Sequence, residues 1–301
     1  MSHHRPKKIS VWRGRLTTPF PFGFFSRPLP FFDKITTQII MLIIDLDNKI
    51  HRKNTMKHIS GKAALLALSI ISASAYASHW SYQGEGAPEH WGELDEAYKT
   101  CKSGMYQSPI NIDNTVKAHI SPLETHYIDG PVILTNNGHT IQASENADTR
   151  DSITLDKQRW TLQQFHFHAP SENTVHGKKY AMEMHLVHKN ADGELTVVAV
   201  MFDQGAANTE LDKLWGVMPG QVDQNVTIKP TLDMNKLLPA DKTYWRFSGS
   251  LTTPPCSEGV TWLVLKHPLT VSAEQLQKFT HTMHHENSRP VQPLHGRLVV
   301  E

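Results

Sequence analysis

Short apolar runs recur at intervals of eight to twelve residues from Val132 onward. Turn residues such as Asn136-Asn137-Gly138 and Asp192-Gly193 separate them. Runs of this length between turn residues are typical of strands, so the pattern predicts a sheet-rich architecture. The expected strands are 132–135, 140–143, 153–155, 160–168, 181–188, 195–202, 244–250 and 260–265.

Two longer segments, 208–217 and 272–285, are predicted to be helices. The second begins with Ser272 and Gln275 in the spacing of a capping box. The irregular, aromatic segment 80–91 (WSYQGEGAPEHW), here called the aromatic arm, precedes a short helix that we expect over 92–99. No internal repeat or linker interrupts the pattern, so the body of the chain is predicted to form one domain.

Two of the predicted strands carry histidines at alternating positions. In the segment Gln164–His168 (QFHFH), successive side chains point to opposite faces, so His166 and His168 share a face. The segment Glu183–His188 (EMHLVH) alternates in the same way and contributes His185. If the two strands pair antiparallel, the three imidazoles converge. Three neutral imidazoles with one open position are the ligand set of a catalytic zinc ion.

Two other interpretations of these histidines stay open at this point. The chain has 19 His, so a His-x-His pair also arises by chance. The spacing from His166 to Glu172 resembles the first motif of the cupins, whose metal is often iron or manganese. Cupins usually carry a glycine where this chain has Trp160, and their second motif is missing downstream. The histidines of the predicted last helix are expected to form a solvated surface patch: His281, His284 and His285.

Charge is unevenly distributed along the chain. Residues 1–77 hold 12 Lys+Arg and 3 Asp+Glu, which leaves 18 basic and 26 acidic residues in the remainder. An acidic body is unfavourable for the phosphate backbone of a nucleic acid. We therefore expect no nucleic-acid partner.

The basic leader contains the pattern of a secretory signal peptide. Lys57 and Lys62 form a basic start after Met56, an apolar run covers 63–74, and Ala75-Tyr76-Ala77 supplies a small-x-small cleavage site. The apolar run is too short to span a bilayer, so no membrane anchor is expected. Residues 56–77 are predicted to be the signal peptide of a periplasmic or secreted protein, with 78–301 as the mature domain. Residues 1–55 are interpreted as an incorrectly assigned start or as a disordered extension.

Only two cysteines occur, Cys101 and Cys256, and both follow the predicted signal peptide. An even pair in an exported protein suggests a disulfide. In the chain-entropy model a bridge closing a loop of about 155 residues contributes about 5 kcal/mol. Two free buried thiols are the alternative.

Seven short motifs occur in one order along the chain. Together they strongly resemble the α-class carbonic anhydrases, in particular the exported bacterial members, over Trp80 to Val300. The resemblance implies a single α/β (α+β) domain around a large, twisted, mostly antiparallel β-sheet with short peripheral helices. The motifs are QSPIN (107–111), NGH (137–139), QFHFH (164–168), SENT (171–174), EMHLVH (183–188), SLTTPP (250–255) and RPVQP (289–293).

The resemblance implies that His166, His168 and His185 bind Zn²⁺. Ligand imidazoles need outer hydrogen-bond partners that fix their tautomers. Three groups of this chain match the family's indirect ligands: Gln164 for His166, Glu183 for His185 and, for His168, a backbone carbonyl near Asn287. It also implies that Cys101 and Cys256 form the disulfide common in exported bacterial members.

Further roles follow from the same resemblance. Thr252 matches a gatekeeper threonine whose hydroxyl donates to an ionised Glu172. His139 matches the proton shuttle, and a histidine with a pKa near 6.5 suits proton exchange with solvent. Tyr82 and Asn137 match polar residues that order active-site water. Six residues match the family's apolar CO₂ pocket: Val187, Val197, Leu251, Thr253, Val260 and Trp262.

The implied activity is the zinc-dependent, reversible hydration of carbon dioxide to bicarbonate and a proton. In this family, the type example of catalytic zinc, zinc-bound hydroxide attacks CO₂ and a histidine shuttle exports the proton. Two other function classes remain: a binding protein that retained the fold, and a hydrolase that attacks esters as a side activity. Exported bacterial relatives are often dimers, which makes a homodimer one expectation. Ala169-Pro170 replaces the Trp-Gly common in animal members, and nothing catalytic is lost.

Overall fold

The computed structural model describes residues 79–145, 151–228 and 231–301. The upstream extension, 1–55, and the predicted signal peptide, 56–77, lie outside the described residues. Within the described ranges, no helix combines the length and the hydrophobicity that crossing a bilayer requires.

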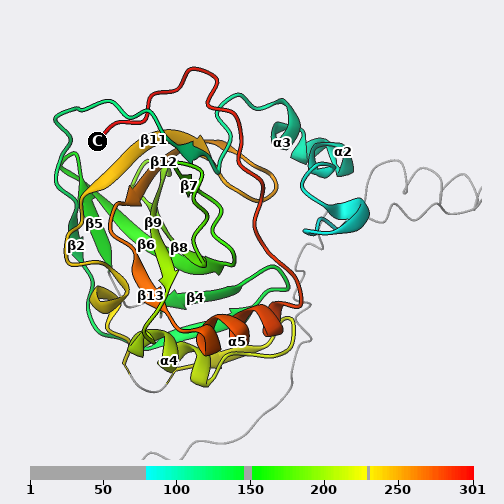
Figure 1. Ribbon diagram of the computed structural model, residues 1–301, viewed down its shortest axis with the longest axis vertical. Helices are drawn as coiled ribbons and strands as arrows, with labels where there is room; N and C mark the ends of the chain where they lie inside the picture. Colours follow the sequence, from blue (N-terminus) through cyan, green and yellow to red (C-terminus); the bar gives the residue numbers. More distant parts are fainter. Residues whose placement is uncertain (1–78, 146–150, 229–230) are drawn as a thin grey trace, which may run out of the picture. The chain divides into compact units, whose positions relative to one another are not determined.

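Eleven strands form one sheet (Figure 1). Its main path runs β10-β3-β4-β6-β8-β9-β12-β11, while β5 joins β6 to β2 and β13 extends β9. All pairs are antiparallel except those of β9 with β12 and β13. The strands of this sheet are β2 (Glu124–His126), β3 (Val132–Asn136), β4 (Ile141–Glu145), β5 (Ser152–Leu155), β6 (Gln158–His168), β8 (Met182–Lys189), β9 (Leu195–Gln204), β10 (Asn225–Thr227), β11 (Tyr244–Ser250), β12 (Glu258–Leu265) and β13 (Leu269–Val271).

The prediction of a large, mostly antiparallel sheet with short helices is confirmed. All eight predicted strands are present, with ends displaced by two residues at most. The structure adds strands that are too short to show a period: β2, β10 and β13, and the parallel pair β1 (Asn111–Ile112) and β7 (Thr174–Val175).

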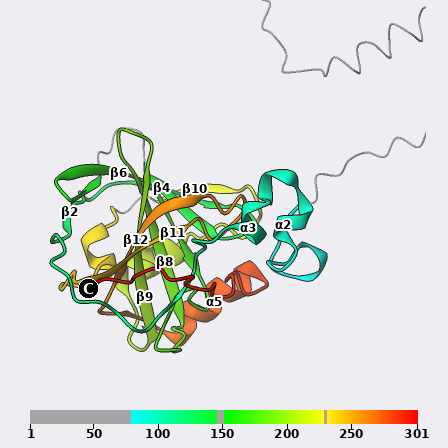
Figure 2. The same ribbon diagram turned by 90° about the horizontal axis from the view of Figure 1, so that it is seen from above.

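The helices lie at the periphery of the sheet. They are α2 (Trp91–Leu94), α3 (Thr100–Ser103), α4 (Thr209–Gly216) and α5 (Ala273–Met283), with the 3₁₀ helices η1 (Gly84–Gly86), η2 (Glu96–Tyr98) and η3 (Met234–Leu237). Ser272 and Gln275 form the predicted capping box of α5. Helices α4 and α5 lie side by side, with Trp215 stacked on Phe279. Helices α2 and α3 lie at the opposite end from β2 (Figure 2).

The prediction of one helix over 92–99 is wrong. Asp95 has an extended backbone (φ −150°, ψ 146°), which ends α2, and its side chain accepts a hydrogen bond from the backbone N–H of Ala97. Aspartate is favoured at such a cap because its carboxylate satisfies a backbone donor that the helix leaves free. The segment therefore contains the end of α2 and the whole of η2, and α3 begins directly after it at Thr100.

The two faces of the sheet carry different side chains. Met182, Met184 and Leu186 of β8 face the larger hydrophobic cluster, which α4 and α5 cover. Val197 and Ala199 of β9 belong to a second cluster on the other face. Because side chains alternate along a strand, the odd-numbered residues of β8 also face this second side. His185 is one of them.

Candidate active site

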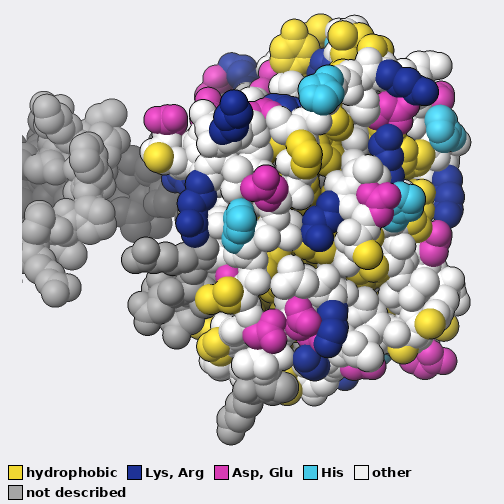
Figure 3. All heavy atoms as spheres, turned by 90° about the vertical axis from the view of Figure 1, so that its left-hand side faces the viewer, with side chains coloured by type: hydrophobic (Ala, Val, Ile, Leu, Met, Phe, Trp, Pro, Cys, Tyr) yellow, Lys and Arg dark blue, Asp and Glu magenta, His cyan; other side chains and the backbone are white. Residues whose placement is uncertain are grey.

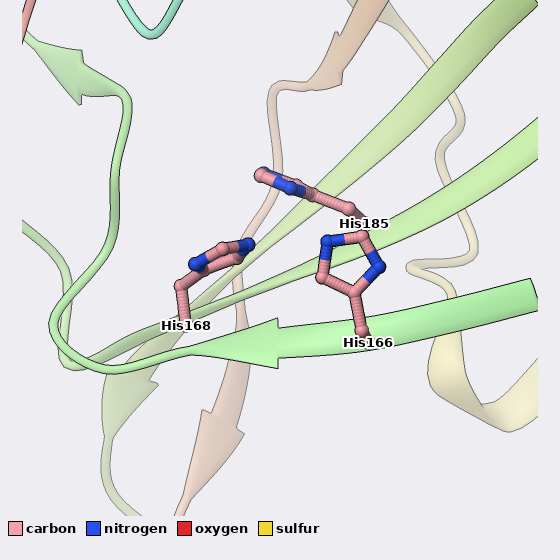
Figure 4. Close-up of side chains that lie close together, drawn as sticks. All are labelled: His166, His168 and His185. Atoms are coloured by element: carbon pink, nitrogen blue, oxygen red, sulfur yellow. The ribbon is translucent and has the colours of Figure 1, made fainter. Parts of the chain in front are cut away.

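Three histidines converge where β6 and β8 pair. The strands are antiparallel, and His166 lies directly opposite His185. Ring centroids are 5.0 Å apart for His166–His168, 5.3 Å for His166–His185 and 4.6 Å for His168–His185. One nitrogen from each ring lies within 4.8 Å of the others, and Figure 4 shows the three rings turned toward one another. Among the described residues, this is the group of side chains arranged to hold a metal ion.

Each ring has one nitrogen engaged with a neighbouring oxygen. Nδ1 of His166 lies 2.8 Å from Gln164 Oε1, and Nδ1 of His168 lies 2.7 Å from the backbone oxygen of Asn287. Nε2 of His185 lies 2.8 Å from Glu183 Oε1. These oxygens act as acceptors, so the engaged nitrogens are the protonated ones and the opposite nitrogens keep a lone pair.

The uncommitted nitrogens fit a divalent cation. Nε2 of His168 is buried and has no hydrogen-bond partner among the described residues, although buried polar atoms are normally paired. Burial, followed by the charges of the neighbouring rings, lowers the pKa of His166 and of His185 well below the usual value. Burial also lowers the pKa of His168. Neutral imidazoles that present lone pairs to one point are the donor set that zinc prefers.

Glu183 supports His185 from a fully buried position. Its Oε2 accepts hydrogen bonds from the backbone N–H groups of Glu172 and Asn173, both 2.8 Å long. Its Oε1 accepts from the Asn173 side chain at 2.7 Å, besides the contact with His185. Burial raises the pKa of Glu183, and these hydrogen bonds oppose the shift because they favour the carboxylate.

Glu172 is fully buried beside the histidines. Its Oε1 accepts from the backbone N–H of Arg289 at 2.8 Å and lies 3.5 Å from His168 Nδ1. The Thr252 side chain interacts with the carboxyl group, but Oε2 has no hydrogen bond of ordinary geometry. Burial raises the pKa of Glu172 to about 8, against the opposing effects of Arg289 and Thr252. Protein groups alone therefore favour the protonated form of Glu172 at pH 7. A cation on the histidines would favour the ionised form that the expected role requires.

An apolar cavity of about 190 Å³ opens over the histidines. Five of the six residues predicted for the substrate pocket line it: Val187, Val197, Leu251, Thr253 and Trp262. Val260 does not line the cavity; it is buried in the hydrophobic cluster that contains Val197 and Trp262. The remaining lining residues are Gln164, His166, His185 and Thr252.

His139 lies in a turn and stacks on the aromatic arm. Asn137 Oδ1 accepts from the backbone N–H groups of His139 and Thr140, so this oxygen is committed to the turn. The His139 ring lies 3.7 Å from that of Trp80, with 12° between their planes, and 5.1 Å from that of His79. Burial, and then the charges of His79 and His285, lower the pKa of His139 to about 4. The expected pKa near 6.5 is therefore wrong for this position of the ring.

Tyr82, on the same arm, packs between Trp80, Trp91 and His285 with ring centroids 5.6–5.7 Å away. Burial, and then the charge of Glu172, raise the pKa of Tyr82 well above its usual value. The phenol therefore lies within the electrostatic reach of the active site and remains protonated at neutral pH.

Cys101 and Cys256 form the expected disulfide. The backbone N–H of Cys256 donates to the oxygen of Thr253, so the bridge is attached to the loop that carries Thr252. Arg289 donates through Nη2 to the oxygen of Cys101 at 2.8 Å. Sequence reasoning assigned no role to Arg289, although its RPVQP motif marked the segment.

The predicted surface patch agrees with the structure. His281 and His284 are exposed, with ring centroids 5.9 Å apart. His285 is partly buried against Tyr82. Sequence reasoning missed the contact of His79 and Trp80 with His139; the only signal was the aromatic composition of the arm.

Comparisons with known proteins agree with this geometry. The chain is 70% identical over 246 residues to a carbonic anhydrase of Klebsiella pneumoniae, covering 82% of this chain and all of that one. The alpha-carbonic anhydrase of Thermovibrio ammonificans, solved with the inhibitor sulfanilamide, is 48% identical, covers 74% of this chain and 99% of its own, and superposes with a TM-score of 0.72. Dioscorin complexed with ascorbate is 30% identical over 74% of this chain and 97% of its own, with a TM-score of 0.70. Since the model of the eukaryotic-type carbonic anhydrases also matches residues 86–301, this chain belongs to the alpha-carbonic anhydrase family and is an enzyme of that kind.

Proposed function

We propose that this protein is a zinc-dependent enzyme that interconverts carbon dioxide and bicarbonate outside the cytoplasm. The observation that carries the proposal is the set of three neutral imidazoles whose uncommitted nitrogens converge below an apolar cavity. Zinc bound by His166, His168 and His185 would supply a Lewis acid that lowers the pKa of its water to about 7, as known for this family.

The surrounding groups orient the ligands. Gln164, Glu183 and the backbone oxygen of Asn287 each hold one ring nitrogen, which fixes the tautomer and the ring plane. Glu183 is itself held by two backbone N–H groups, so the support for His185 is rigid. These contacts present the free lone pairs before any ion binds, which reduces the reorganisation that binding requires.

Thr252 and Glu172 are proposed to orient the nucleophile. Thr252 is 5% exposed and lines the cavity, and its side chain interacts with the Glu172 carboxyl group. A hydroxyl that donates to a carboxylate can only accept from the other side, so its direction is set. The wall of Val187, Val197 and Trp262 excludes water and suits an apolar, weakly held substrate such as CO₂.

His139 is proposed to carry the proton to solvent. In its stacked position the pKa is about 4, so accepting a proton from a group of pKa about 7 is unfavourable by roughly 4 kcal/mol. The shuttle therefore requires the ring to leave Trp80 for solvent, where the pKa returns toward 6.5.

A binding protein on this scaffold is the second candidate, and the likeness to dioscorin is the observation that favours it. Zinc analysis and stopped-flow CO₂ hydration discriminate between the two. We expect one zinc per chain and a hydration activity that a chelator removes and added zinc restores. A zinc-loaded protein without hydration activity would favour the binding protein, and hydrolysis of esters alone would favour the hydrolase.

We also propose that residues 56–77 are removed during export. The disulfide and the bacterial relatives support an oxidising compartment. The Klebsiella relative is matched over its whole length by 246 residues, the length of 56–301. Intact-mass analysis of periplasmic protein should give a chain beginning at Ser78. Peptides from 1–55 in that product would contradict the proposal.

A further inference from the structure

A second cavity, of about 410 Å³, lies apart from the active site and has more than twice the volume of the catalytic cavity. It is found at the end of the sheet that carries β2. On this face, hydrophobic side chains gather in a hollow among Lys/Arg, Asp/Glu and His side chains (Figure 3). The lining comes from four segments that are distant in the sequence: 120–123, 241–244, Lys266 and Glu301.

Strand β11 connects the two cavities. Tyr244, its first residue, lines the second cavity, while Ser250, its last residue, leads into the loop that lines the first. Six residues of extended chain span about 20 Å. The second cavity is therefore a separate site rather than an extension of the catalytic one.

The walls of this cavity are held in place by the fold. Leu123 and the Tyr244 side chain are buried, and Ile120 packs against the larger hydrophobic cluster. The Tyr244 hydroxyl donates to the backbone oxygen of Ser121, which ties the 120–123 segment to β11. The backbone N–H of Lys266 donates to the backbone oxygen of Thr243 at 2.9 Å, which ties Lys266 to the 241–244 segment. A preformed apolar cavity of this size suits a small molecule.

One ammonium group at the cavity has no partner among the described residues. Lys266 Nζ is paired with Glu301 Oε2 at 2.7 Å, and Asp241 Oδ2 lies 3.1 Å from His267 Nε2. The half-buried Lys242 side chain has no hydrogen bond, ion pair or ring contact with any described residue. An ammonium group without a protein partner at the edge of an apolar cavity favours an anionic ligand group.

We propose that this cavity binds a small amphipathic monocarboxylate, with its apolar body against Ile120, Leu123 and Tyr244 and its carboxylate on Lys242. The apolar lining supplies affinity by removing the body of the ligand from water. The ammonium supplies selectivity for the carboxylate over a neutral group of the same shape. Neither contribution depends on the metal or on catalysis, so this site and the proposed function are tested independently.

Phenylacetate is the probe, titrated into the zinc-loaded, isotope-labelled protein while backbone amide signals are followed by NMR. We expect saturable shifts at Leu123, Thr243 and Tyr244. Shifts at Thr252 and Thr253 alone would place the ligand in the catalytic cavity and overturn the proposal. The residue-by-residue readout is needed because a carboxylate can also approach the zinc site.

The Lys242→Gln substitution should weaken binding about tenfold, since it removes a charge-assisted contact. Lys242→Arg should retain it, and Lys236→Gln, which changes an exposed lysine elsewhere, is the matched control. Unchanged signals outside the cavity establish that each variant is folded. Equal affinity for Lys242→Gln, binding of phenylacetamide as tight as that of phenylacetate, or no shift at the cavity amides at millimolar phenylacetate would each contradict the inference.

Discussion

His185 and His188 lie three residues apart on β8 and face opposite sides of the sheet. Both side chains are almost completely buried, at 1% and 0% exposure. Burial lowers the pKa of both, for His188 to about 3. By burial and charge state alone, the two imidazoles are nearly equivalent.

Their neighbours make them different. His185 has one nitrogen on Glu183 and the other turned toward His166 and His168. His188 has Nε2 2.8 Å from the Tyr127 hydroxyl, in the hydrophobic core, and no group of metal-binding side chains among the described residues includes it. Burial therefore makes an imidazole neutral, but only convergence with other donors gives it the arrangement that a metal ion requires.

The largest expected difference between the two histidines is in zinc binding. His185→Ala removes one of three donors and should reduce zinc to well below one per chain. CO₂ hydration should fall by at least about a thousandfold, because a metal ion contributes several kcal/mol to such a reaction. His188→Gln should keep its zinc, measured by elemental analysis of the purified proteins. Full activity in a zinc-free His185→Ala protein would contradict the proposed mechanism.

Acid should reveal the neutral state of His188. Its pKa is about 3 in the folded protein and about 6.5 when unfolded, so the unfolded chain binds more protons between these values. The stability that the neutral His188 contributes should therefore be fully present above pH 6.5. As the pH drops from 6.5 toward 3, the free energy of unfolding should fall by about 1.4 kcal/mol per pH unit from this group.

Urea unfolding at pH 7 and at pH 4.5 measures this effect. Other groups also titrate in this range, so the comparison is between the wild type and His188→Gln. The variant should lose about 2–3 kcal/mol less than the wild type over the same interval. An identical pH dependence in both proteins would mean that His188 is not kept neutral by the fold.

Tyr127→Phe tests the core histidine through its partner. Removing the hydroxyl leaves His188 Nε2 buried without its hydrogen bond, which should lower the free energy of unfolding by about 1–3 kcal/mol. Zinc content and kcat should not change, because the pair lies on the far face from the metal ligands. Tyr106→Phe, at an exposed tyrosine, is the control and should change neither quantity.

The smallest effect is expected at His139, which is half-buried against Trp80. His139→Ala should lower kcat about tenfold in weak buffer, within the range of a positioned acid–base group. The effect on kcat/KM should be much smaller, because CO₂ conversion precedes proton release, and imidazole should restore the rate. A kcat that is unchanged in weak buffer would mean that the proton leaves by another route.

Local patterns were sufficient to predict that three histidines converge. Alternation along a strand puts His166 and His168 on one face, and the same period brings in His185 when two neighbouring strands pair. The capping box of α5 was equally readable, since it depends on residues three apart. These features are determined by backbone geometry over a few residues.

Long-range packing decided the rest. The pKa of Glu172 depends on burial and on Arg289, 117 residues away, and the pKa of His139 depends on the aromatic arm. Val260 has the right residue type but is buried in the hydrophobic cluster and does not line the cavity. The cavity beside Lys242 is assembled from segments between 120 and 301. A sequence pattern determines which face a side chain takes, whereas desolvation and cavity shape depend on what the folded chain packs against that face.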